Sequence, residues 1–68
     1  MRPYTVLFRN NGDAPYTLPN HSIIMAENYQ DAEEIFYDNN TGSLEILWIV
    51  ETDDRDVALE NYWYNTGA

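Results

Sequence analysis

The chain has 68 residues, in which twelve acidic side chains face three arginines and no lysine, for a net charge of -9 at pH 7. A chain of this length forms one domain with a thin core, and the absence of cysteine excludes disulfides and thiolate metal sites. The charge argues against direct binding to nucleic acid or to an anionic membrane, because phosphate contacts need clustered cations. We expect a single domain over residues 1–68.

The N-terminal part predicts two strands joined by a loop. Tyr4–Arg9 is rich in β-branched and aromatic residues, which favour strands. The Asn-Gly pair at positions 11–12 is a strong turn signal. Ser22–Ala26 predicts a second strand, and we expect it to pair antiparallel with the first.

An amphipathic helix is predicted over Tyr29–Asn39. Asn28 suits the N-cap, and Asp31 suits the positively polarised first turn. Apolar residues recur at helical spacing and define one face, formed by Tyr29, Ala32, Ile35 and Phe36. Gly42 follows shortly and suits a left-handed cap at the helix end.

The longest and most apolar strand is predicted over Ser43–Thr52. Because Ile46–Val50 is continuously apolar, we expect this strand at the centre of the sheet. Strand alternation places Leu47 and Ile49 on one face and their sequence neighbours on the other. Both faces of the strand are therefore expected to be covered.

A second helix is predicted over residues 54–65, with Asp53 or Asp54 as its cap. Its apolar positions are spaced for a single helical side and comprise Ala58, Leu59, Tyr62 and Trp63. The resulting order is β-β-α-β-α. It predicts an α+β fold in which a three-stranded antiparallel sheet is covered by one or two helices.

Acidic residues of the first helix recur along one side. The members of this acidic row are Glu27, Asp31, Glu34 and Asp38, and they step by four, three and four positions. Such a row is the ordinary solvated side of an amphipathic helix, or it is a surface that meets a basic protein. In the second interpretation Tyr37 is a contact at the rim.

Apolar residues in the C-terminal half raise the alternative of a homodimer. If one helix covers the sheet, Leu47 and Ile49 are left on an open face, and a second helix or a second copy of the chain must cover them. The adjacent aromatics Trp63 and Tyr64 would extend that face, because tyrosine and tryptophan are favoured at interfaces.

A second acidic group follows the third strand, with Glu51, Asp53 and Asp56. Carboxylate oxygens are the ligands that Ca²⁺ and Mg²⁺ prefer, but aspartate at a helix start also serves as a cap. We assign no metal ligand and keep divalent-metal binding as an alternative. The single histidine, His21, has no cysteine, lysine or Gly-rich phosphate loop to complement it, so we expect no catalytic residue and no cofactor.

Targeting signals are not apparent in the sequence. No apolar run approaches the ~20 residues that span a bilayer. The first residues lack the cleavage-site pattern of a signal peptide. We therefore expect a cytoplasmic protein that does not interact with membranes.

The order strand, strand, "AENYQDAEEIF", strand, which covers Tyr4 to Val50, resembles a layout found in tiny proteins of bacteriophages and mobile elements. The RNA-polymerase-inhibitor family of T7-like phages is similar in this layout, with "AENYQDAEE" as the distinctive motif. The C-terminal aromatic helix departs from that family. The resemblance implies a class, a short phage-type protein that binds a host macromolecule, and it transfers no binding residue.

The leading hypothesis is a non-enzymatic acidic module that binds a basic or nucleic-acid-handling host protein. The expected contact residues are Glu27, Asp31, Glu34, Tyr37 and Asp38. The homodimeric accessory protein and the divalent-metal binder are the alternatives.

Overall fold

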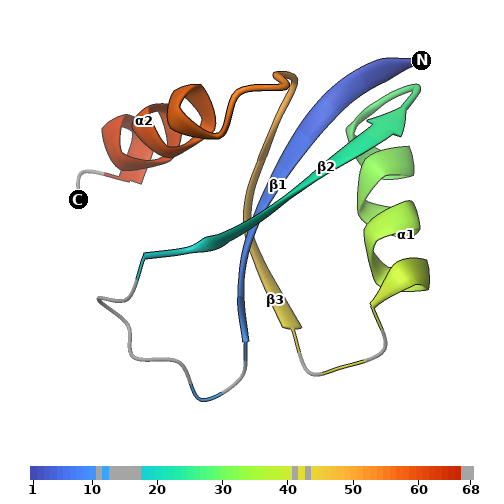
Figure 1. Cartoon of the computed structure of the whole chain (residues 1–68), viewed down its shortest axis with the longest axis horizontal. Helices are drawn as coiled ribbons and strands as arrows, with labels where there is room; N and C mark the ends of the chain where they lie inside the picture. Colours follow the sequence, from blue (N-terminus) through green and yellow to red (C-terminus); the bar gives the residue numbers. More distant parts are fainter. Residues whose placement is uncertain (11, 13–17, 41, 43, 67–68) are drawn as a thin grey trace.

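The computed structural model describes residues 1–10, 12, 18–40, 42 and 44–66. The predicted α+β class and the order β-β-α-β-α are confirmed (Figure 1). The elements are β1 (Arg2–Asn10), β2 (Asn20–Ala26), α1 (Tyr29–Asn39), β3 (Leu44–Val50) and α2 (Arg55–Thr66). Of the predicted turn at 11–12, Asn11 lies outside the described residues, and Gly12 has a φ of 98°, which favours glycine.

The sheet has the order β2-β1-β3, and β1 pairs antiparallel with both neighbours. The predicted pairing of the first two strands is confirmed, but the prediction that the third strand is central is wrong. The central strand is β1. Helix α1 carries the chain from one edge of the β1–β2 hairpin to the other, so β3 can extend the antiparallel sheet only at the free edge of β1.

A β-bulge in β3 changes which side chains share a face. Leu7 pairs with Trp48 and Phe8 pairs with Ile46, so Leu47 is the additional residue without a partner on β1. Beyond the bulge, Ile49 returns to the side of Ile46. The predicted grouping of Leu47 with Ile49, opposite Ile46, is therefore wrong.

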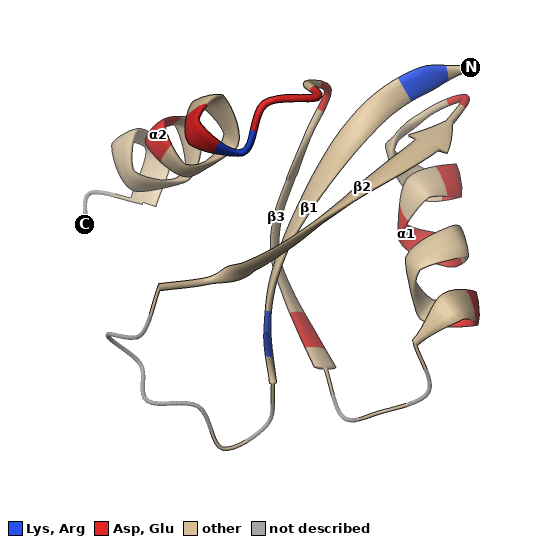
Figure 2. Cartoon of the chain, in the orientation of Figure 1, with Lys and Arg blue, Asp and Glu red and all other residues tan. Residues whose placement is uncertain are grey.

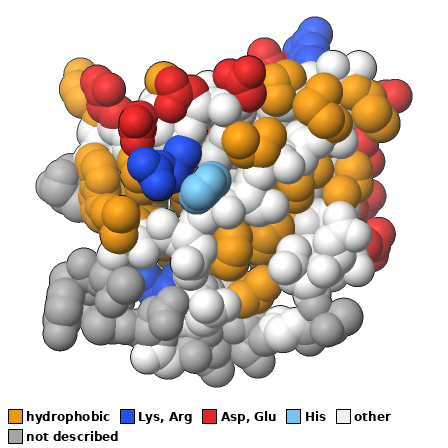
Figure 3. Space-filling model, in the orientation of Figure 1, with side chains coloured by type: hydrophobic (Ala, Val, Ile, Leu, Met, Phe, Trp, Pro, Cys, Tyr) orange, Lys and Arg blue, Asp and Glu red, His pale blue; other side chains and the backbone are white. Residues whose placement is uncertain are grey.

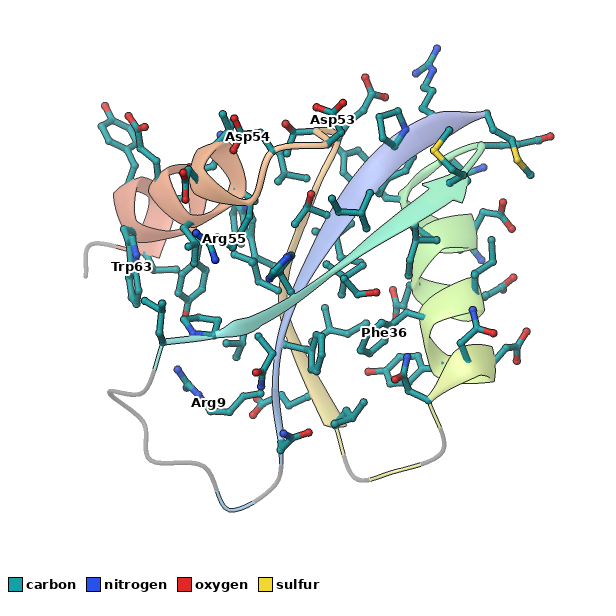
Figure 4. All side chains as sticks on the ribbon, in the orientation of Figure 1. Arg9, Phe36, Asp53, Asp54, Arg55 and Trp63 are labelled. Atoms are coloured by element: carbon teal, nitrogen blue, oxygen red, sulfur yellow. The ribbon has the colours of Figure 1, made fainter. Side chains whose placement is uncertain are left out.

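The main core lies between the sheet and α1. Its buried members are Tyr4, Val6, Ile24, Ala26, Ala32 and Phe36. Phe36 points from α1 toward the sheet (Figure 4), where its ring lies 4.9 Å from the ring of Phe8. Tyr4 and Tyr29 make a second ring contact, edge to face at 5.0 Å. These contacts explain why the apolar side of α1 faces the sheet.

Helix α2 covers the other side of the sheet over β1 and β3 (Figure 1). Leu7 and Ala58 are fully buried there. Thr5 is also fully buried, and its hydroxyl donates a hydrogen bond of 2.8 Å to the carbonyl of Thr52. That bond satisfies a buried polar group and fixes the turn that leads from β3 into α2.

Neither helix of the described residues is long and apolar enough to cross a membrane. The longer of the two, α2, has 12 residues. A bilayer-spanning helix needs about 20 apolar residues.

Replacing Phe36 tests the core beneath α1. Phe36→Ala should lower the free energy of unfolding by about 3–5 kcal/mol, because the ring is fully buried and its removal leaves a cavity. Urea denaturation followed by circular dichroism measures the change. Tyr37→Ala is the matched control, since this neighbouring aromatic is 47% exposed and its loss should be less than about 1 kcal/mol. Equal losses in the two variants would contradict the assigned packing.

Candidate functional site

Figure 2 marks the acidic positions along α1 in red; Asp31, Glu34 and Asp38 lie on the helix, and Glu27 precedes its N-cap. At about 100° per residue, these helix positions lie opposite Phe36, which is buried against the sheet. Glu27, Glu34 and Asp38 are exposed, whereas Asp31 is partly buried. At 1.5 Å rise per residue, the row from Asp31 to Asp38 extends for about 10 Å along the helix. The carboxylates thus form a short negative line on an outward surface.

Asp31 has a structural role at the start of α1. Its backbone N–H donates to the Asn28 side-chain oxygen at 2.8 Å, and its own carboxylate accepts from the backbone N–H of Glu27 at 3.3 Å. Asn28 has the extended backbone of an N-cap. This reciprocal arrangement satisfies donors that the helix leaves free, so Asp31 acts as part of the cap within the row.

Cations do not offset the acidic row within the described part of the chain. The ion pairs found there join Arg2 to Glu51 at 3.2 Å and Arg55 to Asp56 at 3.3 Å, and neither includes a member of the acidic row. Helix α1 itself contains no lysine or arginine. Like charges spaced by four residues destabilise a helix by a few tenths of a kcal/mol, so the row carries a small energetic cost.

Tyr37 lies beside the acidic row. It is 47% exposed, and its ring meets that of Phe36 edge to face at 5.7 Å. At about 100° per residue, Tyr37 is displaced by roughly a quarter turn from the line of Glu34 and Asp38. The ring is therefore held by the core and also presents a surface next to the carboxylates.

The second acidic group does not form a cluster. Asp54 is the cap of α2, because its carboxylate accepts from the backbone N–H of Asp56 at 2.8 Å. Glu51 instead binds Arg2 and accepts from the Tyr4 hydroxyl at 3.4 Å. Asp53 and Asp54 lie near the start of α2 (Figure 4). Within the described residues, no three acidic or histidine side chains are grouped to hold a metal ion.

The residues expected to form a dimer face are dispersed. Ile49 packs against the core beneath α1, and Leu47 is partly buried at the bulge. Trp63 is partly buried, and its ring lies 4.9 Å from that of Tyr62, which in turn meets Trp48 at 6.3 Å. Tyr64 is 87% exposed near the end of α2. The predicted set therefore does not share one open face of the sheet.

The apolar surface of the sheet is on β2, which the sequence did not single out. Ile23 is 48% exposed and Met25 is 52% exposed, because α2 covers β1 and β3 but does not extend over β2. His21 is exposed on the same strand. The alternation of His21, Ile23 and Met25 with buried Ile24 and Ala26 was visible in the sequence. It indicated a strand with one open face, but not which face would stay uncovered.

Comparison of the chain with protein-family models, with curated proteins and with solved structures finds no significant match. The candidate binding sites are therefore the two outward surfaces described above. These are the acidic row of α1 and the uncharged strand β2.

Removing the cap should weaken α1. Asn28→Ala should cost about 1 kcal/mol in the free energy of unfolding, because the N–H of Asp31 loses its acceptor. Asn39→Ala, an equal change at the exposed last residue of the helix, should stay within about 0.5 kcal/mol. Urea denaturation compares the two variants, and a larger loss for Asn39→Ala would refute the capping role.

Tyr4 should make stability fall at alkaline pH. Burial raises the pKa of the Tyr4 hydroxyl above its ordinary value of 10.0, the Glu51 carboxylate raises it further, and Arg2 partly opposes this. The neutral hydroxyl therefore stabilises the fold fully below pH 10, and this contribution is lost as pH rises through the raised pKa.

Thermal melting between about pH 8 and pH 11.5 measures the effect, and Tyr4→Phe is the control because phenylalanine cannot ionise. The variant should lose less stability than the wild type over this range. The five other tyrosines are common to both proteins. Identical pH dependence in the two proteins would show that Tyr4 is not responsible.

Proposed function

We propose that this protein is a non-enzymatic, acidic protein-binding module that docks a basic protein on the outer side of α1. The observation that carries the proposal is the acidic row itself. Glu34 and Asp38 are exposed about one turn apart on α1, Glu27 is exposed just before the helix, and no described cation pairs with them. A partner that supplies lysine or arginine side chains would remove the repulsion along the row.

Electrostatic attraction would mainly affect the rate of encounter. A net charge of -9 on a small domain accelerates association with a basic surface, and added salt weakens that attraction. The helix holds the backbone of Glu34 and Asp38 about one turn apart, so binding requires no ordering of the main chain there. Tyr37, anchored against Phe36, would supply an apolar contact at the rim.

The exposure of the carboxylates in the acidic row favours a role in protein binding over a role in acid–base catalysis. Acid–base catalysis by carboxylates depends on an enclosed, water-poor setting, which an outward helix side does not provide. The one acidic side chain of the row with internal hydrogen bonds, Asp31, serves the cap. We therefore assign Glu27, Glu34 and Asp38 to partner binding, with Asp31 as the residue that orders the start of the helix.

The partner class follows from charge and from the layout of the chain. A basic protein that handles nucleic acid carries the cationic surface that would complement the row. The small phage proteins that the layout resembles suggest action on a host protein in the cytoplasm. No residue-level correspondence supports a particular target.

Matched charge-neutral variants test the proposal. One variant replaces Glu27, Glu34 and Asp38 with their amides, and the control replaces the exposed Glu45, Asp53 and Glu60 in the same way. Both change the net charge from -9 to -6. The probe is a fluorescent arginine–alanine peptide of defined sequence, and anisotropy measures its binding at about 50 mM and about 300 mM NaCl.

The α1 variant should bind the peptide about tenfold or more weakly at low salt. The control should change by only about twofold, because it loses the same overall charge without losing the row. Wild-type binding should weaken as salt rises. Equal effects of the two variants would show that the charge acts diffusely and that α1 is not the site.

A further inference from the structure

We propose that two copies of this chain pair through their β2 strands to form a continuous six-stranded sheet. Strand β2 is an edge strand that pairs only with β1 among the described residues. An edge strand carries backbone N–H and C=O groups along its outer side that can pair with another strand. In Figure 1, β2 crosses in front of β1; α1 packs on one face of β2, and α2 does not extend over the other face.

The charge distribution favours a second copy at this edge. Asn20–Ala26 contains no acidic or basic residue apart from His21, although the chain carries twelve carboxylates. In Figure 3, which shows this side of the molecule, the red carboxylates lie along the top and the right margin, and hydrophobic or uncharged atoms fill much of the centre. Two strongly acidic copies can therefore meet here without placing carboxylates directly against each other.

The strand is also complementary to itself. Antiparallel pairing with full overlap of the seven residues places a twofold axis at Ile23, the middle residue. Ile23 then faces Ile23 of the second copy, and Met25 faces its His21. The exposed sides of Ile23 and Met25, which α2 leaves uncovered in one copy, become a shared apolar strip. Cross-strand contacts of this kind stabilise sheets.

The small size of the domain provides the thermodynamic reason for association. The fully buried core is small, and domains of this length often gain stability from association. Pairing also places the two acidic α1 helices on the same face of the extended sheet. Their mutual repulsion should decrease with salt, so self-association should strengthen as salt rises. Binding of a basic partner to α1 should weaken under the same change, so the two proposals fail independently.

Cysteine cross-linking tests the register, because the natural chain has no cysteine. Paired residues on antiparallel strands have Cα atoms about 4.5–5.5 Å apart, within the range for a disulfide. Ile23→Cys should therefore form a covalent dimer on mild oxidation. Met25→Cys is the matched control, because its Cα would lie about 14 Å from that of its symmetry mate, four residues along the strand. The two positions are similarly exposed, at 48% and 52%.

Light scattering after size-exclusion chromatography tests association without cross-linking. The mass should rise with concentration from 8.0 kDa toward twice that value. Ile23→Asp should weaken the dimer about tenfold or more, because it opposes two carboxylates at the twofold axis. Val57→Asp makes the same change at a residue of similar exposure (46%) on α2, and it should leave the dimer intact. Circular dichroism verifies that both variants are folded.

Three results would overturn the proposal. The first is a mass that stays at 8.0 kDa up to a protein concentration of about 1 mM. That result would indicate that the edge of β2 does not pair with a second copy and is open to an extended segment of another protein. The second is equal cross-linking of Ile23→Cys and Met25→Cys, which indicates random collision. The third is a dimer that survives Ile23→Asp in a folded protein or that weakens as salt rises.

Discussion

Burial of β1 on both faces and along both edges determines how every other element packs. Tyr4, Thr5, Val6 and Leu7 are at most 2% exposed, because β2 and β3 pair with both edges of the strand and a helix covers each face. Alternate residues of the strand serve two different layers. Tyr4 and Val6 bind α1 to the sheet, while Thr5 and Leu7 lie under α2. One strand thus provides four of the five largest fully buried side chains of the described residues, in a domain that has little interior available.

Function in such a domain is expected on its outside. The two outward features differ in chemistry and in position, since the acidic row lies opposite the buried side of α1 and β2 is an uncharged edge. Each follows from the same packing. Because α1 buries its apolar side against β1 and β2, its carboxylates face water, and because α2 stops short of β2, Ile23 and Met25 stay exposed. The separation allows one surface to engage a basic partner while the other engages a second copy.

Local signals in the sequence were sufficient to predict the helices and strands. They were not sufficient to predict how the strands pair with one another. The bounds of α1 and its Asn28 cap were predicted because the capping residue and the apolar spacing are both local. Gly42 was predicted as the helix cap, but the side chain of Asn40 takes that role by donating to the carbonyl of Phe36. The placement of β3 at the centre was wrong because an edge strand between two helices is as apolar as a central one. The bulge at Leu47, which moved Ile49 into the core, depends on pairing with β1 and has no local signature.

NMR can show whether the basic partner and the second copy bind two separate outer surfaces, as proposed. Amide proton–nitrogen spectra would be recorded during titration with the basic peptide and, separately, during dilution of the protein. We expect the peptide to shift signals of α1 around Glu34 and Asp38, and dilution to shift signals of β2 around Ile23. Shifts from both experiments on the same residues, or shifts spread evenly over the domain, would contradict the use of two separate surfaces.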